Sequence, residues 1–128
     1  MKKILFIVLF ITFSSEATVS CDDIEVSDQI FLCSKKSFEQ SDDILNDTYK
    51  KLLSKINTEY SSNEKLKSEY VNKVKLSQRA WISFRDKNCE AFSFQIEPGT
   101  QAHETSLNLC KNKMTQKRIK DLIFIGNQ

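Results

Sequence analysis

The chain has 128 residues, a formal net charge of +2 and four cysteines, but only two glycines and one proline. So few turn-forming residues exclude a β-rich domain, which needs many tight turns, and predict helices joined by few loops. The near balance of charge gives no indication of a nucleic-acid partner or of an anionic membrane surface as a binding site.

The first twenty residues have the pattern of a secretory signal peptide. Lys2 and Lys3 precede an apolar stretch over residues 4–13, and small residues follow it. Ten residues (4–13) are too few to span a bilayer, which needs roughly 20. We therefore expect residues 1–20 to be a signal peptide, cleaved before Thr18 or before Cys21. The mature protein is then exported, which in a bacterium means periplasmic or secreted, with no membrane span.

Residues 18–21 (Thr-Val-Ser-Cys) resemble a bacterial lipobox, whose cysteine receives a lipid. The match is imperfect, because Thr18 stands where such boxes usually carry an aliphatic residue. Lipidation would also consume the Cys21 sulfur and leave an odd number of cysteines in an oxidising compartment. We do not expect a lipid anchor at Cys21.

Residues 21–128 have the length of a single domain, and a domain of this size benefits from disulfide bonds. Four cysteines allow three pairing schemes, of which we favour the one with two local bonds, Cys21–Cys33 and Cys89–Cys110. The cysteine spacings fit neither a zinc ribbon nor a C-x-x-C redox motif. With His103 as the only histidine, we expect no metal site and no cofactor.

Charge is distributed unevenly along the mature chain. Its net value is −6 over residues 21–49, +3 over residues 50–104 and +4 over residues 105–128. Two interpretations remain open: the acidic first segment packs against the basic last one, or both are solvated faces.

The first helix is expected over residues 37–56, with a turn or two before it at residues 28–33. Ser37-x-x-Gln40 has the form of a capping box at its start. At 100° per residue, one narrow arc holds most of its large apolar side chains. That arc contains Phe38, Leu45, Tyr49, Leu52, Leu53 and Ile56, together with the polar residues Asp42 and Asn46.

The second helix is expected over residues 63–94, restarted by a second capping box, Ser61-x-x-Glu64. It would be the longest helix, at roughly 45 Å. Its broad apolar side contains Leu66, Tyr70, Val71, Val74, Trp81, Ile82, Phe84, Cys89 and Phe92, with Gln78 and Arg85 in the middle.

Residues 96–104, which contain Pro98-Gly99, form the one clear loop. Thr105 or Ser106 can then cap a third helix that ends near Ile123. Its inner side carries Leu107, Cys110, Met114 and Leu122. The predicted architecture is all-α: a small disulfide-linked helical bundle with one long central helix.

Two helices thus each place two polar groups on an apolar face. Because an unpaired charge there is costly, we expect the two pairs to meet, with an Asp42–Arg85 ion pair supported by Asn46 and Gln78. An acid/base site is the alternative, but one carboxylate beside a guanidinium has no second titratable partner and no nucleophile. We therefore expect a structural network, no catalytic residue and no enzyme.

The motifs combine into a recognisable order. Residues 45–49 (L-N-D-T-Y) and 78–86 (Q-R-A-W-I-S-F-R-D) are followed by Cys89, Cys110 and Thr115-x-x-Arg118. This order resembles the LprI-like lysozyme-inhibitor domain family of small exported bacterial proteins, over essentially the whole mature chain. The resemblance implies an all-helical, disulfide-linked domain of the bacterial envelope, and lysozyme inhibition through a few characterised members.

The signature residues of that family coincide with the predicted core: Asn46, Tyr49, Gln78, Trp81 and Arg85. They therefore specify a fold and not an inhibitory surface. One departure concerns the turn after the third cysteine, which is glycine-rich in many members. Here that turn contains the single glycine Gly99, in the sequence Glu-Pro-Gly-Thr.

Two functions from different classes follow. The first is an exported binding protein that inhibits a lysozyme by non-covalent occlusion of its cleft. The candidate partner-contact loop holds Glu97, Pro98, Gly99, His103 and Glu104. The alternative is a non-inhibitory periplasmic adaptor or stress-related protein with another envelope protein as partner. A cell-wall hydrolase is a third class, but the two paired carboxylates that glycoside hydrolysis needs are not recognisable.

Overall fold

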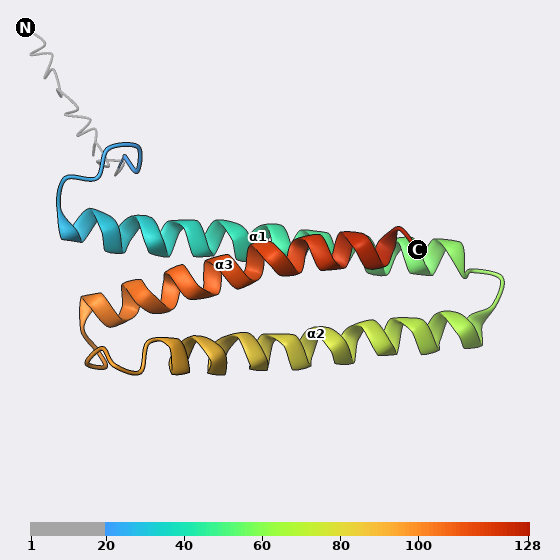
Figure 1. Cartoon of the computed structure of the whole chain (residues 1–128). Coiled ribbons are helices and arrows are strands. Elements are labelled where there is room, and N and C mark those ends of the chain that lie inside the picture. The colour runs from blue at the N-terminus through green and yellow to red at the C-terminus, as the bar shows by residue number, and fades with distance from the viewer. Residues whose placement is uncertain (1–19) are drawn as a thin grey trace, which may run out of the picture.

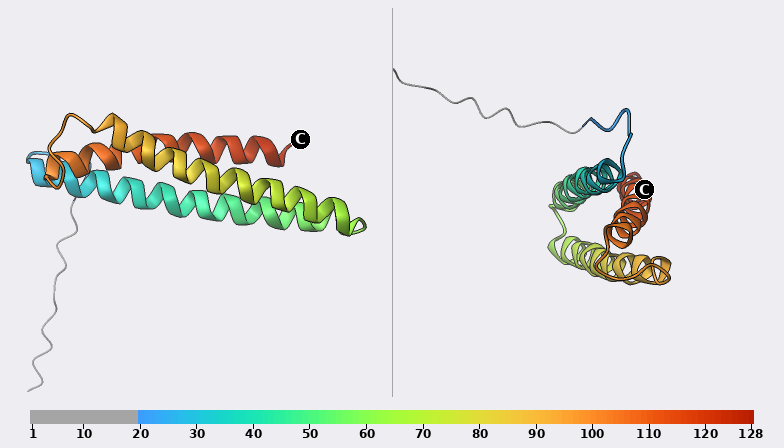
Figure 2. Two further views of the ribbon diagram at one scale, coloured as in Figure 1. Left: turned by 90° about the horizontal axis from the view of Figure 1, so that it is seen from below. Right: turned by 90° about the vertical axis from the view of Figure 1, so that its left-hand side faces the viewer.

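The computed structural model describes residues 20–128, which form three long helices joined by two short connections (Figure 1). α1 spans Ser27–Glu59, α2 spans Glu64–Phe92 and α3 spans Gln101–Gly126. α2 runs antiparallel to the other two helices, and the end-on view in Figure 2 places the three at the corners of a triangle. The all-α bundle is confirmed. The expected signal peptide lies, except for Ser20, outside the described residues.

α1 begins at Ser27 and not at Ser37, so the expected start was wrong. The side chain of Gln29 caps this end, because its Oε1 accepts hydrogen bonds from the backbone N–H groups of Glu25 (2.7 Å) and Val26 (3.2 Å). No glycine or proline interrupts residues 27–59, so Ser37 lies within a continuous helix. With 33 residues, α1 is about 50 Å long. The longest helix is therefore the first and not the second.

α2 lies close to its expected range, although its cap differs. Asn63, and not Ser61, caps the helix: its Oδ1 accepts from the backbone N–H of Leu66 at 3.0 Å. The expected apolar side is too broad, because Leu66, Ile82, Phe84 and Phe92 are exposed. In a three-helix bundle each helix buries only the stripe that faces its two neighbours.

α3 begins at Gln101, several residues before the expected caps Thr105 and Ser106. Thr100 is the cap: its hydroxyl donates to the Glu97 carbonyl (2.7 Å) and accepts from the His103 N–H (3.2 Å). The loop is correspondingly shorter than expected. His103 therefore lies in the first turn of α3 and not in the loop.

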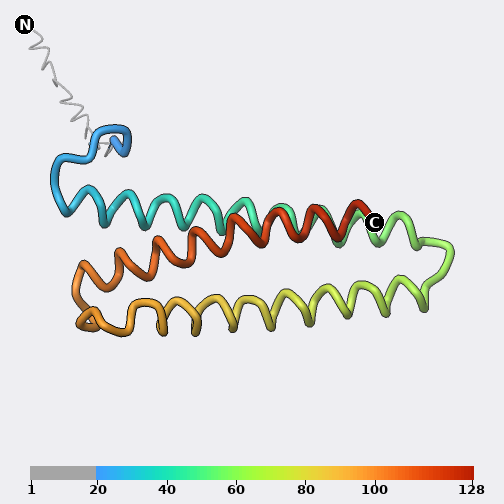
Figure 3. Tube along the Cα trace, in the orientation of Figure 1, coloured from blue at the N-terminus to red at the C-terminus, as the bar shows by residue number. Residues whose placement is uncertain are grey.

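The hydrophobic core occupies the half of the bundle that contains the α1–α2 connection and the C-terminus, on the right of Figure 3. Its fully buried members are Leu45, Leu52, Ile56, Val74 and Leu122. Tyr49 and Trp81 pack against this cluster and are partly buried. α3 packs chiefly against α1, so these two helices form most of the core between them.

Disulfide bonds fasten the opposite half of the molecule. Cys21–Cys33 ties the segment before α1 to that helix, and Cys89–Cys110 ties the end of α2 to α3. The local pairing is the one that the structure has. It also places the Cys21 sulfur, which a lipid anchor would need, in a bond.

The acidic first segment and the basic last segment do not form ion pairs between α1 and α3. Within residues 20–128, no salt bridge joins an acid of α1 to a base of α3.

Across residues 20–128, none of the helices combines the length and the hydropathy that a bilayer crossing requires.

Candidate functional site

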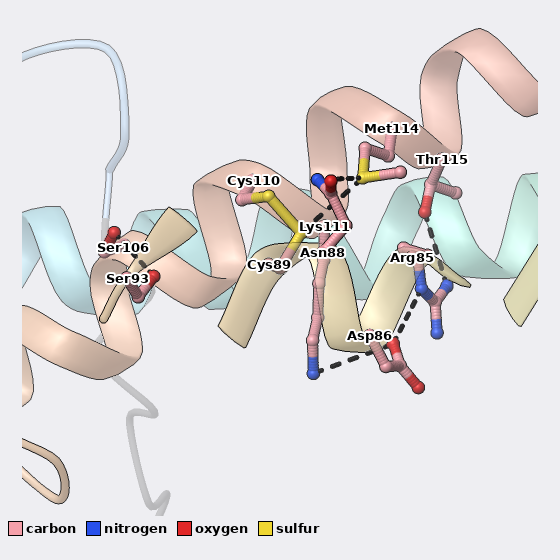
Figure 4. The surroundings of a disulfide bond; sticks show 10 residues. All are labelled: Arg85, Asp86, Asn88, Cys89, Ser93, Ser106, Cys110, Lys111, Met114 and Thr115. Atoms are coloured by element: carbon pink, nitrogen blue, oxygen red, sulfur yellow. Dashed lines mark hydrogen bonds and ion pairs between the residues drawn. A yellow bond between two sulfur atoms is a disulfide. The ribbon is translucent and has the colours of Figure 1, made fainter. Parts of the chain in front are cut away.

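Arg85 of α2 is the centre of the polar network, to which all three helices contribute. Figure 4 shows its contacts with Asp86 and Thr115. Arg85 Nη1 donates to Asp42 Oδ1 of α1 at 2.8 Å and to Thr115 Oγ1 of α3 at 3.4 Å. Its Nε donates to Asp86 Oδ1 at 2.9 Å. The Arg85 side chain is 9% exposed but that of Asp42 is 38% exposed, so the ion pair lies at the edge of the interior.

Gln78 and Asn46 do not support this ion pair as expected. Gln78 is buried, but its Oε1 accepts from Arg118 Nε of α3 at 3.0 Å. Asn46 is exposed on α1, because Leu45 and Tyr49 already occupy the inward side of that turn. The expectation that Asn46 belongs to the buried network was therefore wrong.

A stack of alternating cations and aromatic rings lies between the three helices. We define this cation–aromatic stack as Lys111, Phe38, Arg85, Trp81 and Arg118. The Arg85 guanidinium carbon lies 5.2 Å from the ring centre of Phe38 and 5.3 Å from that of Trp81. Arg118 lies on Trp81 at 5.7 Å, and Lys111 on Phe38 at 5.8 Å. Such contacts stabilise each cation while it is removed from water.

Arg118 is the member that the sequence analysis left out of the network. Its Nη2 donates to Ser77 Oγ at 2.9 Å, which complements the bond from its Nε to Gln78. Burial lowers the pKa of the Arg118 guanidinium, and the Asp121 carboxylate partly opposes the shift. Arginine nevertheless stays protonated in proteins, so this residue has no proton to exchange. The stack holds the helices in register and offers no reaction chemistry.

A second feature is the end of the bundle where α1 begins, α2 ends and α3 begins. We call residues 20–34 and 88–110 the acidic end. These two segments contain seven carboxylates and neither lysine nor arginine. Every one of the seven is exposed: Asp22, Asp23, Glu25, Asp28, Glu90, Glu97 and Glu104. A hydrogen bond from Asn108 Nδ2 to Ser34 Oγ (3.5 Å) joins the two segments.

The loop at this end places its predicted contact residues in different environments. Glu97, Pro98 and Gly99 are exposed, and Gly99 has a φ of +79°, a conformation that favours glycine. Glu104 is exposed in the first turn of α3. The His103 side chain is only 14% exposed, so it is not a contact residue of the loop surface. The helix starts directly after the cap Thr100, so His103 lies in the first turn of α3 and not in the loop.

Phe94 is the contact candidate that the sequence analysis missed, because residue 94 was assigned to the end of α2. It lies in the loop and is 84% exposed. Its neighbour Ser93 is fully buried and donates through its hydroxyl to Ser106 Oγ at 2.8 Å, as Figure 4 shows. The loop is thus fixed to α3 at Ser93 while it presents an aromatic ring to solvent at Phe94.

A third feature is an apolar groove of about 650 Å³ between the end of α2 and the outer face of α3. Its apolar lining includes Phe92, Leu109, Cys110 and Met114. Beside it, Asn88 Nδ2 contacts Met114 Sδ at 3.4 Å and Cys89 Sγ contacts the same sulfur at 3.7 Å.

Comparisons with known proteins identify the class to which this bundle belongs. The model of the family described as "Lysozyme inhibitor LprI" matches residues 21–122. The chain belongs to this family, as the order of its motifs indicated. A comparison with curated proteins found no match.

A solved structure has the same fold. It is the crystal structure of a DUF1311 family protein from Pseudomonas putida KT2440, with a TM-score of 0.72 and 20% sequence identity. The match covers 83% of this chain and 99% of that one. At this identity the likeness concerns the helical architecture alone.

Proposed function

We propose that this protein is an exported lysozyme inhibitor of the bacterial envelope, periplasmic or secreted, which blocks the enzyme cleft without covalent chemistry. Membership of the lysozyme-inhibitor family supports the target. The signal-like N-terminus and two disulfide bonds support the compartment.

The observation that carries the proposal is the acidic end. Lysozymes are commonly strongly basic, so an inhibitor gains association rate and specificity from an acidic surface. The mature chain as a whole has a net charge of +1, which gives no such attraction. The seven exposed carboxylates of the acidic end provide it locally, because no lysine or arginine belongs to either of its segments.

The loop between α2 and α3 supports occlusion as the mode of inhibition. Phe94 is an exposed aromatic side chain on a loop that Ser93 and Thr100 hold in place, and the exposed Glu97 belongs to the same loop. Aromatic residues that enter a pocket contribute much of the energy of protein interfaces. A fixed loop also loses little conformational freedom when it binds.

The test is inhibition of c-type, g-type and i-type lysozymes by the purified protein, followed as cell-wall lysis, with complex formation measured by calorimetry. We expect saturable inhibition of at least one class at micromolar or lower concentration. Glu97→Lys should weaken it, and Glu69→Lys, at the opposite end of the bundle, is the charge-matched control. Equal effects of the two reversals would exclude the acidic end as the contact surface.

The second candidate is a non-inhibitory periplasmic adaptor, which the apolar groove on α3 favours. It predicts no inhibition and no heat of binding with any lysozyme class. Cell fractionation tests the compartment separately: an exported protein should leave the cytoplasm and lose residues 1–17 or 1–20.

A further inference from the structure

Seven of the ten residues that line the apolar groove belong to residues 88–110 of the acidic end, but the lining differs from the rest of that end in its charge. Its lining contains no carboxylate, and its only charged members are Lys113 and Lys117. On α3 the lining extends from Ala102 to Lys117, a helical distance of about 22 Å. The groove is therefore elongated, apolar for most of its length and basic toward one end.

We propose that this groove binds a single-chain amphiphile with an anionic head group. The acyl chain lies over Leu109 and Met114 beside Phe92, and the head group lies at Lys113 and Lys117. The volume of about 650 Å³ is within the range of small-molecule sites. Leu109 and Phe92 are 52% and 70% exposed, so a chain in the groove would remove apolar surface from water.

The polar groups beside the groove favour an acyl chain over an extended peptide. The Ser106 hydroxyl is engaged by Ser93, and the Asn88 amide contacts Met114. Beyond the first turn, the backbone N–H groups of α3 are bonded within the helix. An extended peptide would therefore bury N–H and C=O groups that find few partners, which is costly, whereas a hydrocarbon chain has none to satisfy.

The surface of the groove also suits a flexible chain. Cys110 and Met114 contribute sulfur atoms, and thioether side chains adapt to irregular apolar ligands. The Cys89–Cys110 disulfide keeps the end of α2 beside α3, so the groove persists without a ligand.

The two lysines are available to a head group. Lys113 is exposed, and Lys117 Nζ donates to Asp121 Oδ2 at 3.1 Å in a pair between residues four apart on the helix. Exposed pairs of this kind contribute little, so an anionic head group can compete for the ammonium.

The experiment is calorimetric titration of the oxidised protein with octanoate, decanoate and dodecanoate, each below its micellar concentration. We expect one site, with affinity rising by up to about fifteenfold for each added pair of methylenes, and by less where the chain stays partly exposed. Dodecyl sulfate should bind as dodecanoate does. Dodecyl maltoside, which is neutral, should bind with an affinity lower by about fivefold or more. Equal affinity for anionic, neutral and cationic dodecyl compounds would overturn the proposal.

Two pairs of variants locate the site. Leu109→Gln should reduce dodecanoate affinity about tenfold, whereas Leu76→Gln, equally exposed on α2 but outside the groove, should not. Lys113→Gln with Lys117→Gln should abolish the preference for anionic over neutral heads, and Lys65→Gln with Lys73→Gln should preserve it. A dodecanoate affinity that Leu109→Gln leaves unchanged would contradict the proposal. So would a groove that binds a protein partner but none of the amphiphiles.

Discussion

At the scale of single residues, Arg85 has the largest structural role. It contacts Asp42, Asp86, Thr115 and the rings of Phe38 and Trp81, while its own side chain is 9% exposed. Because Asp42 is 38% exposed, water can solvate its carboxylate when the arginine is removed. The cost of removing Arg85 lies in lost packing and an unpaired Thr115 more than in an isolated charge.

Arg85→Ala is expected to lower the free energy of unfolding by roughly 3 kcal/mol, through a cavity between two rings and the lost hydrogen bonds. Asp42→Asn should cost less, because that side chain stays partly solvated. Denaturant titration followed by circular dichroism measures both. A larger loss for Asp42→Asn would show that the carboxylate, and not the stack, dominates.

Phe94 is the residue whose substitution tests binding without disturbing the fold. If the proposed function is correct, Phe94→Ala should weaken lysozyme binding about tenfold or more, as hot-spot aromatic residues do. Its melting temperature should not change, because the ring is 84% exposed. Phe84→Ala removes an exposed ring from the middle of α2 and should leave affinity unchanged. Calorimetry with the inhibited lysozyme compares the two.

At the scale of helices, the two starts that the sequence placed wrongly give a matched test. Thr100→Ala should destabilise the protein by about 1 kcal/mol, because Thr100 caps α3. Ser37→Ala should change stability by less than roughly 0.5 kcal/mol, because Ser37 lies inside α1. Thermal unfolding of both variants measures the two losses of stability. If Ser37→Ala lost as much stability as Thr100→Ala, Ser37 would be a helix cap.

Periodicity was sufficient to predict the three helices and their order, since the apolar residues of α1 recur on one arc and few breakers occur. It was not sufficient for the helix starts, because Ser-x-x-Gln at residue 37 has the capping pattern while the residues before it are equally able to be helical. It also predicted the contact between Asp42 and Arg85. The expected partner of Gln78, Arg85, was wrong. Two arginines on different helices are available to the buried polar groups, and Gln78 accepts from Arg118.

The acidic end could be predicted from the sequence only in part. Residues 20–34 are already acidic in the sequence, with four carboxylates and no base, but the other three carboxylates belong to a segment more than fifty residues away. Only the placement of the first turns of α1 beside the first turns of α3 makes them one surface.

At the scale of the whole molecule, the hydrophobic core and the disulfide bonds divide the bundle between them. The core holds the half that contains the α1–α2 connection, whereas Cys89–Cys110 fastens α2 to α3 in the other half. α2 makes fewer contacts with its neighbours than α3 does with α1. The end of α2 therefore depends on its disulfide bond.

Replacing Cys89 and Cys110 by serine should lower the free energy of unfolding by about 3 kcal/mol, as expected for a loop of this length. Replacing Cys21 and Cys33 should cost less than half as much, because that bond fastens a segment that precedes α1. Hydrogen exchange should show fraying of residues 80–92 in the first variant only. If both replacements lowered the free energy of unfolding equally, the two disulfide bonds would stabilise the fold equally.

The cation–aromatic stack has one more consequence. Trp81 is the only tryptophan of the chain, and its indole lies against guanidinium groups from two helices, Arg85 of α2 and Arg118 of α3. Its ultraviolet emission therefore originates from a single place where the helices meet. The protein contains an intrinsic fluorescent reporter of helix assembly, whose colour and intensity register the approach or departure of α3 without any attached dye.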